Sequence, residues 1–367
     1  MHKIRKKCLA ASLALLPWVG MAQTNGVWTL QNCIDYAVAH NVQLLKSAAA
    51  EQSASVDVAE AKAGLLPSLS GDLTQGVSYR PFQESGGSFV NGGIATSAAD
   101  KVTQNGSYGI NAQWVVWNGG KNRMSITNSQ YSQQLAAYDT QTQANKVKEQ
   151  IAQLYVQILY MTEAEKVNRT LLLQDSTICE RGQQMVNVGS MSKADLAQLQ
   201  SQVSQGRYNV VNVQTQIDNA KMQLRQLMEL PADEAFDVQP VDATDVQVLN
   251  SIPSKDAIYS SALDSRPEIK RSQLAIEQSH LSTKIAKSGY LPTISLTGGI
   301  GDSHMTGSQT NWAKQMKNNF NGSLGVTVSI PIFDNRKNKS AVERGQNHYF
   351  DELGSLARHT RKTCAAD

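Results

Sequence analysis

The chain has 367 residues, a formal net charge of +3, and 18% charged against 41% hydrophobic residues. A charge this close to balance argues against a surface for nucleic acid, so we expect no nucleic-acid partner. The length allows a sizeable core, while only 9 prolines in a chain rich in Gln, Ser and Ala favour long exposed helices.

The first residues, Met1–Ala22, predict a secretory signal peptide. A basic segment at His2–Lys7 precedes an apolar run at Cys8–Leu16, and small residues end the stretch at Ala22. The apolar run is too short to cross a bilayer as a retained helix. We therefore expect a mature chain that has left the cytoplasm.

A switch from helix to strand follows the signal peptide and occurs twice. A helical run ends at Gly64, and Pro67 opens a stretch in which apolar and polar residues alternate. The same device returns at Gly289 and Pro292. We expect each glycine to end its helix in a left-handed cap and each proline to begin a strand. The pattern predicts two copies of one unit, at 23–230 and, incomplete, at 255–344.

Alternation of period two predicts strands near 67–79, 107–117, 292–301 and 323–333. One face of these strands is built from small polar residues and glycine. The opposite face is apolar, and it would contain Tyr108, Ile110, Trp114, Val116, Ile294, Leu296, Leu324, Val326, Val328 and Ile330.

Two architectures fit such strands: a soluble sandwich, and a membrane barrel whose apolar face meets outer-membrane lipid. The polar face is poor in charge, with Asp72 as an exception that would face the lumen, and aromatic residues lie near strand ends at Tyr79, Trp117 and Phe333. These features favour the barrel. Four strands cannot close a barrel, and an open sheet edge in lipid leaves backbone groups unpaired. The strands must then be shared between chains.

A long helical hairpin is predicted at 121–230. No proline occurs from Asn122 to Val186, which allows a helix approaching about 100 Å. The following helix spaces its apolar residues by three and four from Leu196 to Leu227, as in an antiparallel coiled coil. Between the helices, Gly189 suits a left-handed cap, and Ser192–Asp195 matches a capping box.

The remaining stretches give no sign of chemistry. The segment 231–254 is acidic and is interpreted as a solvated connector rather than an ion site. Cys33, Cys179 and Cys364 have no metal-ligand spacing, the histidines are scattered, and Gly299–Gly301 lacks the third glycine of a dinucleotide loop. We therefore expect no catalytic residue, no metal and no cofactor.

The doubled helix–Gly-x-Leu-Pro–strand unit, the opening Trp28–Leu30 and the tip Asn187–Gly189 together resemble the TolC-type outer-membrane efflux and secretion channels. The resemblance implies an α+β membrane protein in the outer membrane of a Gram-negative bacterium. It would form a homotrimer with one shared β-barrel and a periplasmic barrel of coiled-coil helices. Its partners would be a periplasmic adaptor (membrane fusion) protein, which touches the tip at Val188, Gly189 and Ser190, and an inner-membrane transporter. The family often has a bulky aliphatic residue where Ser190 stands.

The second copy departs from this family pattern. No second long hairpin follows Phe333, so the family's gating residues cannot be assigned, and the tail 345–367 loses the apolar repeat and is expected to be poorly ordered. Two alternatives to a channel protomer remain: a periplasmic coiled-coil adaptor or scaffold, and a shortened channel that does not function.

Overall fold

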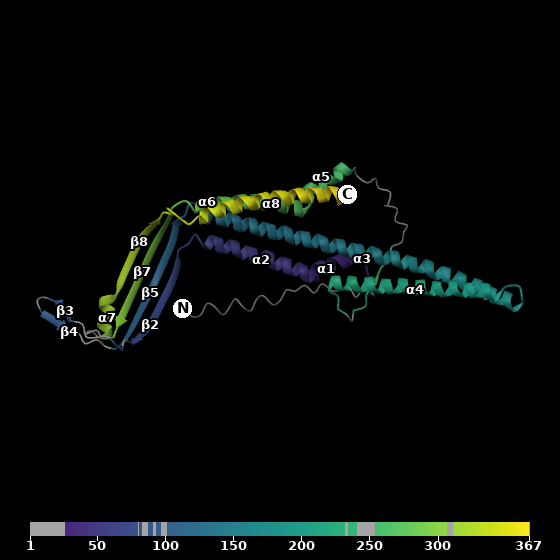
Figure 1. Ribbon diagram of the computed structural model, residues 1–367, viewed down its shortest axis with the longest axis horizontal. Coiled ribbons are helices and arrows are strands. Elements are labelled where there is room, and N and C mark those ends of the chain that lie inside the picture. The colour runs from purple at the N-terminus through teal and green to yellow at the C-terminus, as the bar shows by residue number, and fades with distance from the viewer. Residues whose placement is uncertain are drawn as a thin grey trace, which may run out of the picture. The chain divides into compact units, whose positions relative to one another are not determined.

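The computed structural model describes residues 26–79, 81–82, 87–90, 93–96, 101–231, 234–240, 254–306 and 311–366 (Figure 1). The expected signal peptide and most of the acidic connector lie outside these residues. The chain divides into two compact units. The first contains Met1–Ala48 and Thr140–Ile252, and the second contains Ala49–Asp139 and Pro253–Asp367.

The first unit is built mainly from helices. A break after His40 separates two helices of this unit, because the Asn41 side chain accepts hydrogen bonds from the amides of Gln43 and Leu44 and so starts a new helix. Asn41 also donates to the carbonyl oxygen of Leu227, at 2.8 Å. The elements with residues in this unit are β1 (Val27–Trp28), α1 (Leu30–His40), α2 (Val42–Ala63), α3 (Lys121–Asn187), α4 (Lys193–Met228) and β6 (Asp237–Val238).

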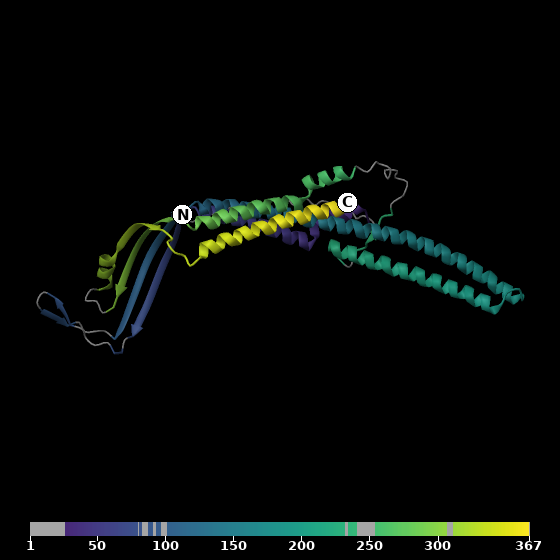
Figure 2. The ribbon, with the colours of Figure 1, turned by 45° about the horizontal axis from the view of Figure 1, so that its top comes forward.

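The predicted long hairpin is confirmed, with α3 and α4 side by side and antiparallel (Figures 1 and 2). Leu172 of α3 lies against Gly206 of α4, and Gly182 of α3 lies against Leu199 of α4. A later residue of α3 therefore contacts an earlier residue of α4, as in an antiparallel pair. The two helices bury one apolar stripe, in which the buried side chains are Val147, Ile151, Tyr155, Ile158 and Met161 of α3 with Ile217, Ala220, Leu224 and Met228 of α4.

The second unit contains a four-stranded antiparallel sheet in the order β2-β5-β7-β8 within the described residues. All four predicted strands are present, with different ends: β2 (Ser68–Tyr79), β5 (Val102–Trp117), β7 (Thr293–Met305) and β8 (Asn321–Ser329). Ile330, expected on the apolar face, therefore lies one residue beyond β8. A small hairpin of β3 (Gly87–Val90) and β4 (Gly93–Thr96) lies between β2 and β5 in the chain.

The helices that lie wholly in the second unit are α5 (Lys255–Ser265), α6 (Pro267–Ser288), α7 (Trp312–Asn319) and α8 (Lys337–Ala366). The prediction of a poorly ordered tail was wrong, because α8 is one continuous helix that packs on α6. That prediction rested on the loss of the regular apolar repeat in residues 345–367. Instead, α6 buries mainly small side chains, and Gly345 of α8 lies against Thr283. Close approach of two helices over small residues replaces the missing stripe.

Candidate functional site

The strand register places the apolar residues of the sheet on one face. Residues directly opposite each other share a face, and Trp114, Leu296 and Val326 form one such row across β5, β7 and β8. Ile110 lies opposite Ile300, and Ile294 lies opposite Val328. The register therefore brings together Tyr108, Ile110, Trp114, Ile294, Leu296, Leu324, Val326 and Val328, as the alternation predicted.

Val116 does not follow the predicted alternation. The register shifts between Val115 and Trp117, so that Ser295 pairs with Val115 and Ile294 pairs with Trp117. Val116 is thus the extra residue of a β-bulge. Trp117 takes the position on the apolar face that was expected for Val116. A simple period of two cannot reveal such an insertion.

The apolar face remains largely uncovered. Leu73 of β2 is 77% exposed and Leu324 of β8 is 80% exposed, and Ile110, Val326 and Val328 are exposed as well. A sandwich would bury these side chains against a second layer. A contiguous apolar patch of this kind marks a surface that meets lipid or another protein.

The opposite face of the sheet is polar and almost without charge. Among the described residues of these strands, Asp72 is the charged side chain on that face. Asp302 and His304 lie on the apolar face, near its end, because Asp302 pairs with Tyr108 and His304 pairs with Gly106. The sequence prediction missed both because it ended this strand at Gly301.

The two outer edges of the sheet have no partner strand in the described chain. The edge strands β2 and β8 run in opposite directions, since three antiparallel steps separate them. An unpaired edge strand presents free N–H and C=O groups that can pair with another chain.

Helix α7, which the sequence did not predict, covers the part of β7 that β8 leaves unpaired. Gln315 accepts a hydrogen bond from the amide of Met305 at 2.8 Å and donates to its carbonyl oxygen at 3.0 Å. Asn319 donates to the carbonyl oxygen of Ser303 at 2.6 Å. These side chains replace the ladder that a longer β8 would form. The Asn311 cap, which accepts from the Lys314 amide, was the available signal for this helix.

The hairpin tip between α3 and α4 has the predicted geometry. Gly189 has a φ of +80°, Ser190 N–H donates to the carbonyl oxygen of Met185, and Gly189 N–H donates to that of Val186. This pair of bonds is a Schellman motif. The side chain of Ser192 accepts from the Asp195 amide at 3.1 Å and thereby starts α4.

The tip residues singled out from the sequence are accessible. The side chain of Val188 is 79% exposed, and Gly189 and Ser190 are exposed beside it. The turn thus presents a small neutral surface held by backbone hydrogen bonds.

The helix-to-strand switches differ from the prediction in one respect. Gly289 has a right-handed φ of −63°, and Gly64 is not among the residues with positive φ, so neither forms the expected left-handed cap. Each helix instead ends in tight turns in which the amide bonds the carbonyl three residues earlier, as in Leu66 to Ala63 and Leu291 to Ser288. Pro67 and Pro292 each directly precede a strand, as predicted.

Positive φ values occur instead where each second strand turns into its helix. Gly119 and Gly120 adopt them in the first copy, and Asn335 and Arg336 adopt them in the second. Just beyond these turns, Asn122 donates to the carbonyl oxygen of Gly64 at 3.4 Å, and Asn338 donates to that of Gly289 at 2.7 Å. The two copies thus repeat the same contact, which supports the predicted duplication.

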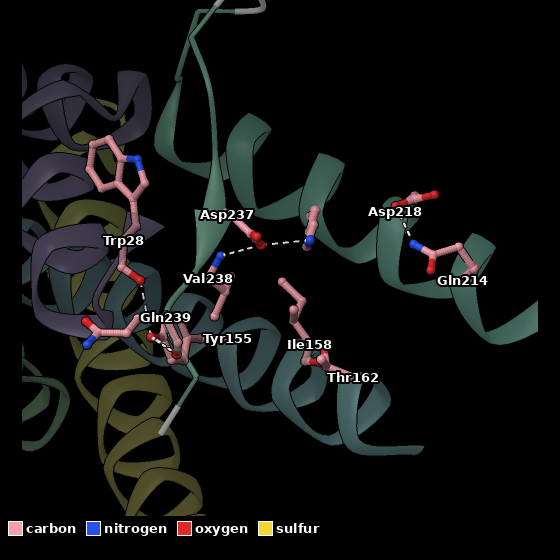
Figure 3. A network of polar contacts seen from close by, with 10 residues as sticks. Trp28, Tyr155, Ile158, Thr162, Gln214, Asp218, Asp237, Val238 and Gln239 are labelled. Carbon is pink, nitrogen blue, oxygen red and sulfur yellow. Dashed lines mark hydrogen bonds and ion pairs between the residues drawn. The ribbon is translucent and has the colours of Figure 1, made fainter. Parts of the chain in front are cut away.

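A buried tyrosine, Tyr155 of α3, links β1 to the residue that follows β6 (Figure 3). The Tyr155 hydroxyl lies 3.2 Å from the carbonyl oxygen of Trp28 and 3.1 Å from that of Gln239. These residues belong to or follow the parallel pair β1–β6. Burial raises the pKa of the Tyr155 phenol, and the nearby Cys33 thiol raises it further. The hydroxyl therefore keeps its proton and remains a donor.

The acidic residue beside this clamp forms an ion pair. Asp237 lies 2.8 Å from the Lys221 ammonium. Burial raises the pKa of the Asp237 carboxyl, but the hydrogen bonds and charge of Lys221 and the Val238 amide outweigh it and lower the pKa overall. The contact is structural and leaves no carboxylic acid poised for catalysis here.

Among the described residues, no group of three or more His, Cys, Asp or Glu side chains is placed to hold a metal ion. In the same part of the chain, we find no helix with the length and apolarity to cross a membrane.

The chain matches a family model described as outer membrane efflux protein over residues 33–229 and 258–352. The chain belongs to the outer membrane efflux protein family. The match includes both copies of the unit and the hairpin between them, so the family assignment rests on most of the chain. As a member of this family, the protein is an outer-membrane efflux protein.

Two curated relatives of this efflux protein are similar over most of its length. Outer membrane protein TolC of Escherichia coli K12 is 26% identical over 359 residues, covering 94% of this chain and 68% of the relative. The pyoverdine export outer membrane protein OpmQ of Pseudomonas aeruginosa is 23% identical over 321 residues, covering 87% of this chain and 64% of the relative.

Solved structures of outer-membrane proteins share the fold of the efflux protein. VceC of Vibrio cholerae superimposes with a TM-score of 0.73 at 16% identity, covering 91% of this chain and 75% of VceC. The CmeC channel of Campylobacter jejuni gives a TM-score of 0.71 at 18% identity, covering 91% of this chain and 68% of CmeC. The family and these neighbours are transport channels rather than enzymes.

Proposed function

We propose that three copies of this chain form a passive outer-membrane duct that exports substrates from the periplasm to the exterior. The observation that carries this proposal is the sheet with one exposed apolar face, one nearly uncharged polar face and two unpaired edges. An open sheet is not viable in lipid, whereas a closed one is. In a barrel, the apolar face meets lipid and the polar face lines water. The protein itself performs no catalytic step.

The edges allow closure by identical neighbours. Because β2 and β8 run in opposite directions, β8 of one protomer can pair antiparallel with β2 of the next, and repetition closes a fully antiparallel ring. Three copies of a four-stranded sheet give twelve strands, enough to leave a water-filled lumen. The trimer follows the resemblance to TolC-type channels.

The hairpin tip supplies the site for a periplasmic partner. Val188, Gly189 and Ser190 are exposed on a turn fixed by backbone hydrogen bonds. We propose that this surface docks the adaptor protein of a tripartite efflux or type I secretion system, which connects the duct to an inner-membrane transporter.

The assembly is tested by measuring the mass of the protein extracted in mild detergent, using two neighbouring substitutions on β8. Val326→Lys places a charge on the proposed lipid face, at a cost of about 2–4 kcal/mol at mid-bilayer, whereas Thr327→Lys places it on the lumen face. We expect trimers for the parent and for Thr327→Lys, and loss of membrane-inserted trimers for Val326→Lys. A monomer, or recovery in the soluble periplasm without detergent, would favour the adaptor or scaffold instead.

A further inference from the structure

Within the described strands, the polar face of the sheet is charged at a single residue, Asp72. In the described strands, β5 and β8 carry no Asp, Glu, Lys or Arg, and the acidic residue of β7, Asp302, lies on the apolar face. Asp72 of β2 is the charged group that remains on the polar side. The face is otherwise built from Ser, Thr, Asn, Gln and Gly, apart from the apolar residues Val115 and Met305 near its two ends.

The surroundings of Asp72 leave its carboxylate open to water. Asp72 lies opposite Gly109, which in turn lies opposite Gly301, so no side chain stands beside it in the neighbouring positions of that row. Within the described chain, no Lys, Arg or His forms an ion pair with Asp72.

A neighbouring amide fixes the position of this carboxylate. The Asn111 side chain donates to Asp72 Oδ2 at 2.7 Å. Asn111 reaches across Gly299, where a Cβ atom would lie 2.8 Å from its Oδ1, so the glycine leaves space for this orientation. The hydrogen bond engages one carboxylate oxygen with a neutral donor, and the negative charge is left uncompensated.

We infer that Asp72 makes the lumen of the β-barrel prefer cations over anions. The inference rests on the proposed trimer, in which threefold symmetry places three such carboxylates in one ring. Twelve strands spaced by about 4.8 Å and tilted in a barrel give a backbone radius of about 12 Å. The Debye length is about 10 Å at 0.1 M salt and about 3 Å at 1 M. The ring therefore influences ions across the lumen in dilute salt, and the low-dielectric wall strengthens its field.

The preferred cargo follows from this charge. Inorganic cations and cationic amphiphiles pass the ring with a lowered barrier, whereas anions meet a raised one. Because the remaining strand residues of the polar face are neutral, removal of one carboxylate per protomer removes the charge that these strands contribute to the lumen.

The test is the reversal potential of the full-length protein in planar bilayers under a KCl gradient near about 0.1 M. We expect Asp72→Asn to lower the ratio of K⁺ to Cl⁻ permeability by about threefold, as the screened Coulomb energy of three charges at this radius predicts. Asp72→Glu should keep the preference and Asp72→Lys should reverse it. All differences should shrink near about 1 M salt.

Asp302→Asn is the matched control, because it neutralises a carboxylate of the same sheet on the opposite face. Its permeability ratio should equal that of the parent. Conducting Asp72→Asn channels with the parental ratio would overturn the inference and leave the proposed duct intact, as would an equal loss in Asp302→Asn. If the parent forms no conducting channel, the proposed function fails, and this inference fails with it.

Discussion

Single hydrogen bonds hold the first unit at positions that a sequence pattern does not reveal. The hydroxyl of Tyr155, a residue only 3% exposed, contacts carbonyl oxygens on both sides of the β1–β6 pair. A buried carbonyl that loses its donor costs free energy because water cannot replace the bond. No pattern in the sequence singles out Tyr155, because its partners Trp28 and Gln239 are distant in the chain.

Tyr155→Phe should therefore lower the free energy of unfolding of the first unit by about 1–2 kcal/mol. Tyr160→Phe provides the control, since Tyr160 lies on the same helix but is 73% exposed. Thermal unfolding in detergent, followed by circular dichroism, measures both variants. Equal midpoints for Tyr155→Phe and the parent would show that the hydroxyl contributes nothing.

The backbone of Gly189 is the second determinant at this scale. Nothing lies within 4 Å of a Cβ placed there, so a substitution acts through its φ of +80° alone. Gly189→Val should cost about 1 kcal/mol or more and speed hydrogen exchange of the Ser190 amide about fivefold. Gly189→Asn should exchange more slowly than the Val variant, because asparagine tolerates this conformation. Identical exchange in both variants would contradict the backbone argument.

At the scale of elements, periodicity predicted the sheet and the long hairpin because both bury or expose one face regularly. It predicted the apolar row through Trp114, Leu296 and Val326. It failed where the backbone departs from regularity, as at the bulge residue Val116 and at Gly64 and Gly289, which end their helices without positive φ. Glycine permits a left-handed turn but does not require one.

The exposed positions of the candidate site could be read from the sequence, whereas its edges could not. Strand alternation separates two faces, but pairing partners and the length mismatch between β7 and β8 depend on contacts across the sheet. Helix α7 is held in place because Gln315 and Asn319 donate hydrogen bonds to the unpaired backbone of β7. Short polar helices of this kind have no apolar stripe long enough to predict.

Gln315→Leu removes both side-chain bonds to Met305 and should expose the edge of β7. We expect faster hydrogen exchange at the Met305 amide and a loss of about 1 kcal/mol in local stability. Gln315→Glu retains an acceptor for that amide and should exchange more slowly than the Leu variant. Lys317→Ala changes an exposed residue of the same helix and serves as the control. Unchanged exchange at Met305 in Gln315→Leu would exclude α7 as the cover of this edge.

At the scale of the whole molecule, the function depends on which solvent each face of the sheet meets. Family membership places the protein among outer-membrane efflux proteins, and the register separates apolar from polar side chains. The central claim is that neighbouring residues on one strand point into different media, lipid and water. Leu73 and Thr74 of β2 offer this comparison, since they are adjacent, exposed and on opposite faces.

The native thiols must not react with the label in such a comparison. Burial raises the pKa of the Cys33 thiol to about 11, and its side chain has no exposed surface, so it should not react with a maleimide label near neutral pH. Raising the pH from 7 to about 9 leaves it protonated and should not change this. Cys179 is partly exposed and is replaced by serine, together with Cys364.

The decisive measurement is quenching of a fluorophore attached in this background at Leu73→Cys or Thr74→Cys, with the protein in lipid bilayers. A lipid-soluble quencher should act on the label at position 73, and a water-soluble quencher should act on the label at position 74. Equal access of the water-soluble quencher to both positions, with no effect of the lipid-soluble one, would contradict a membrane barrel.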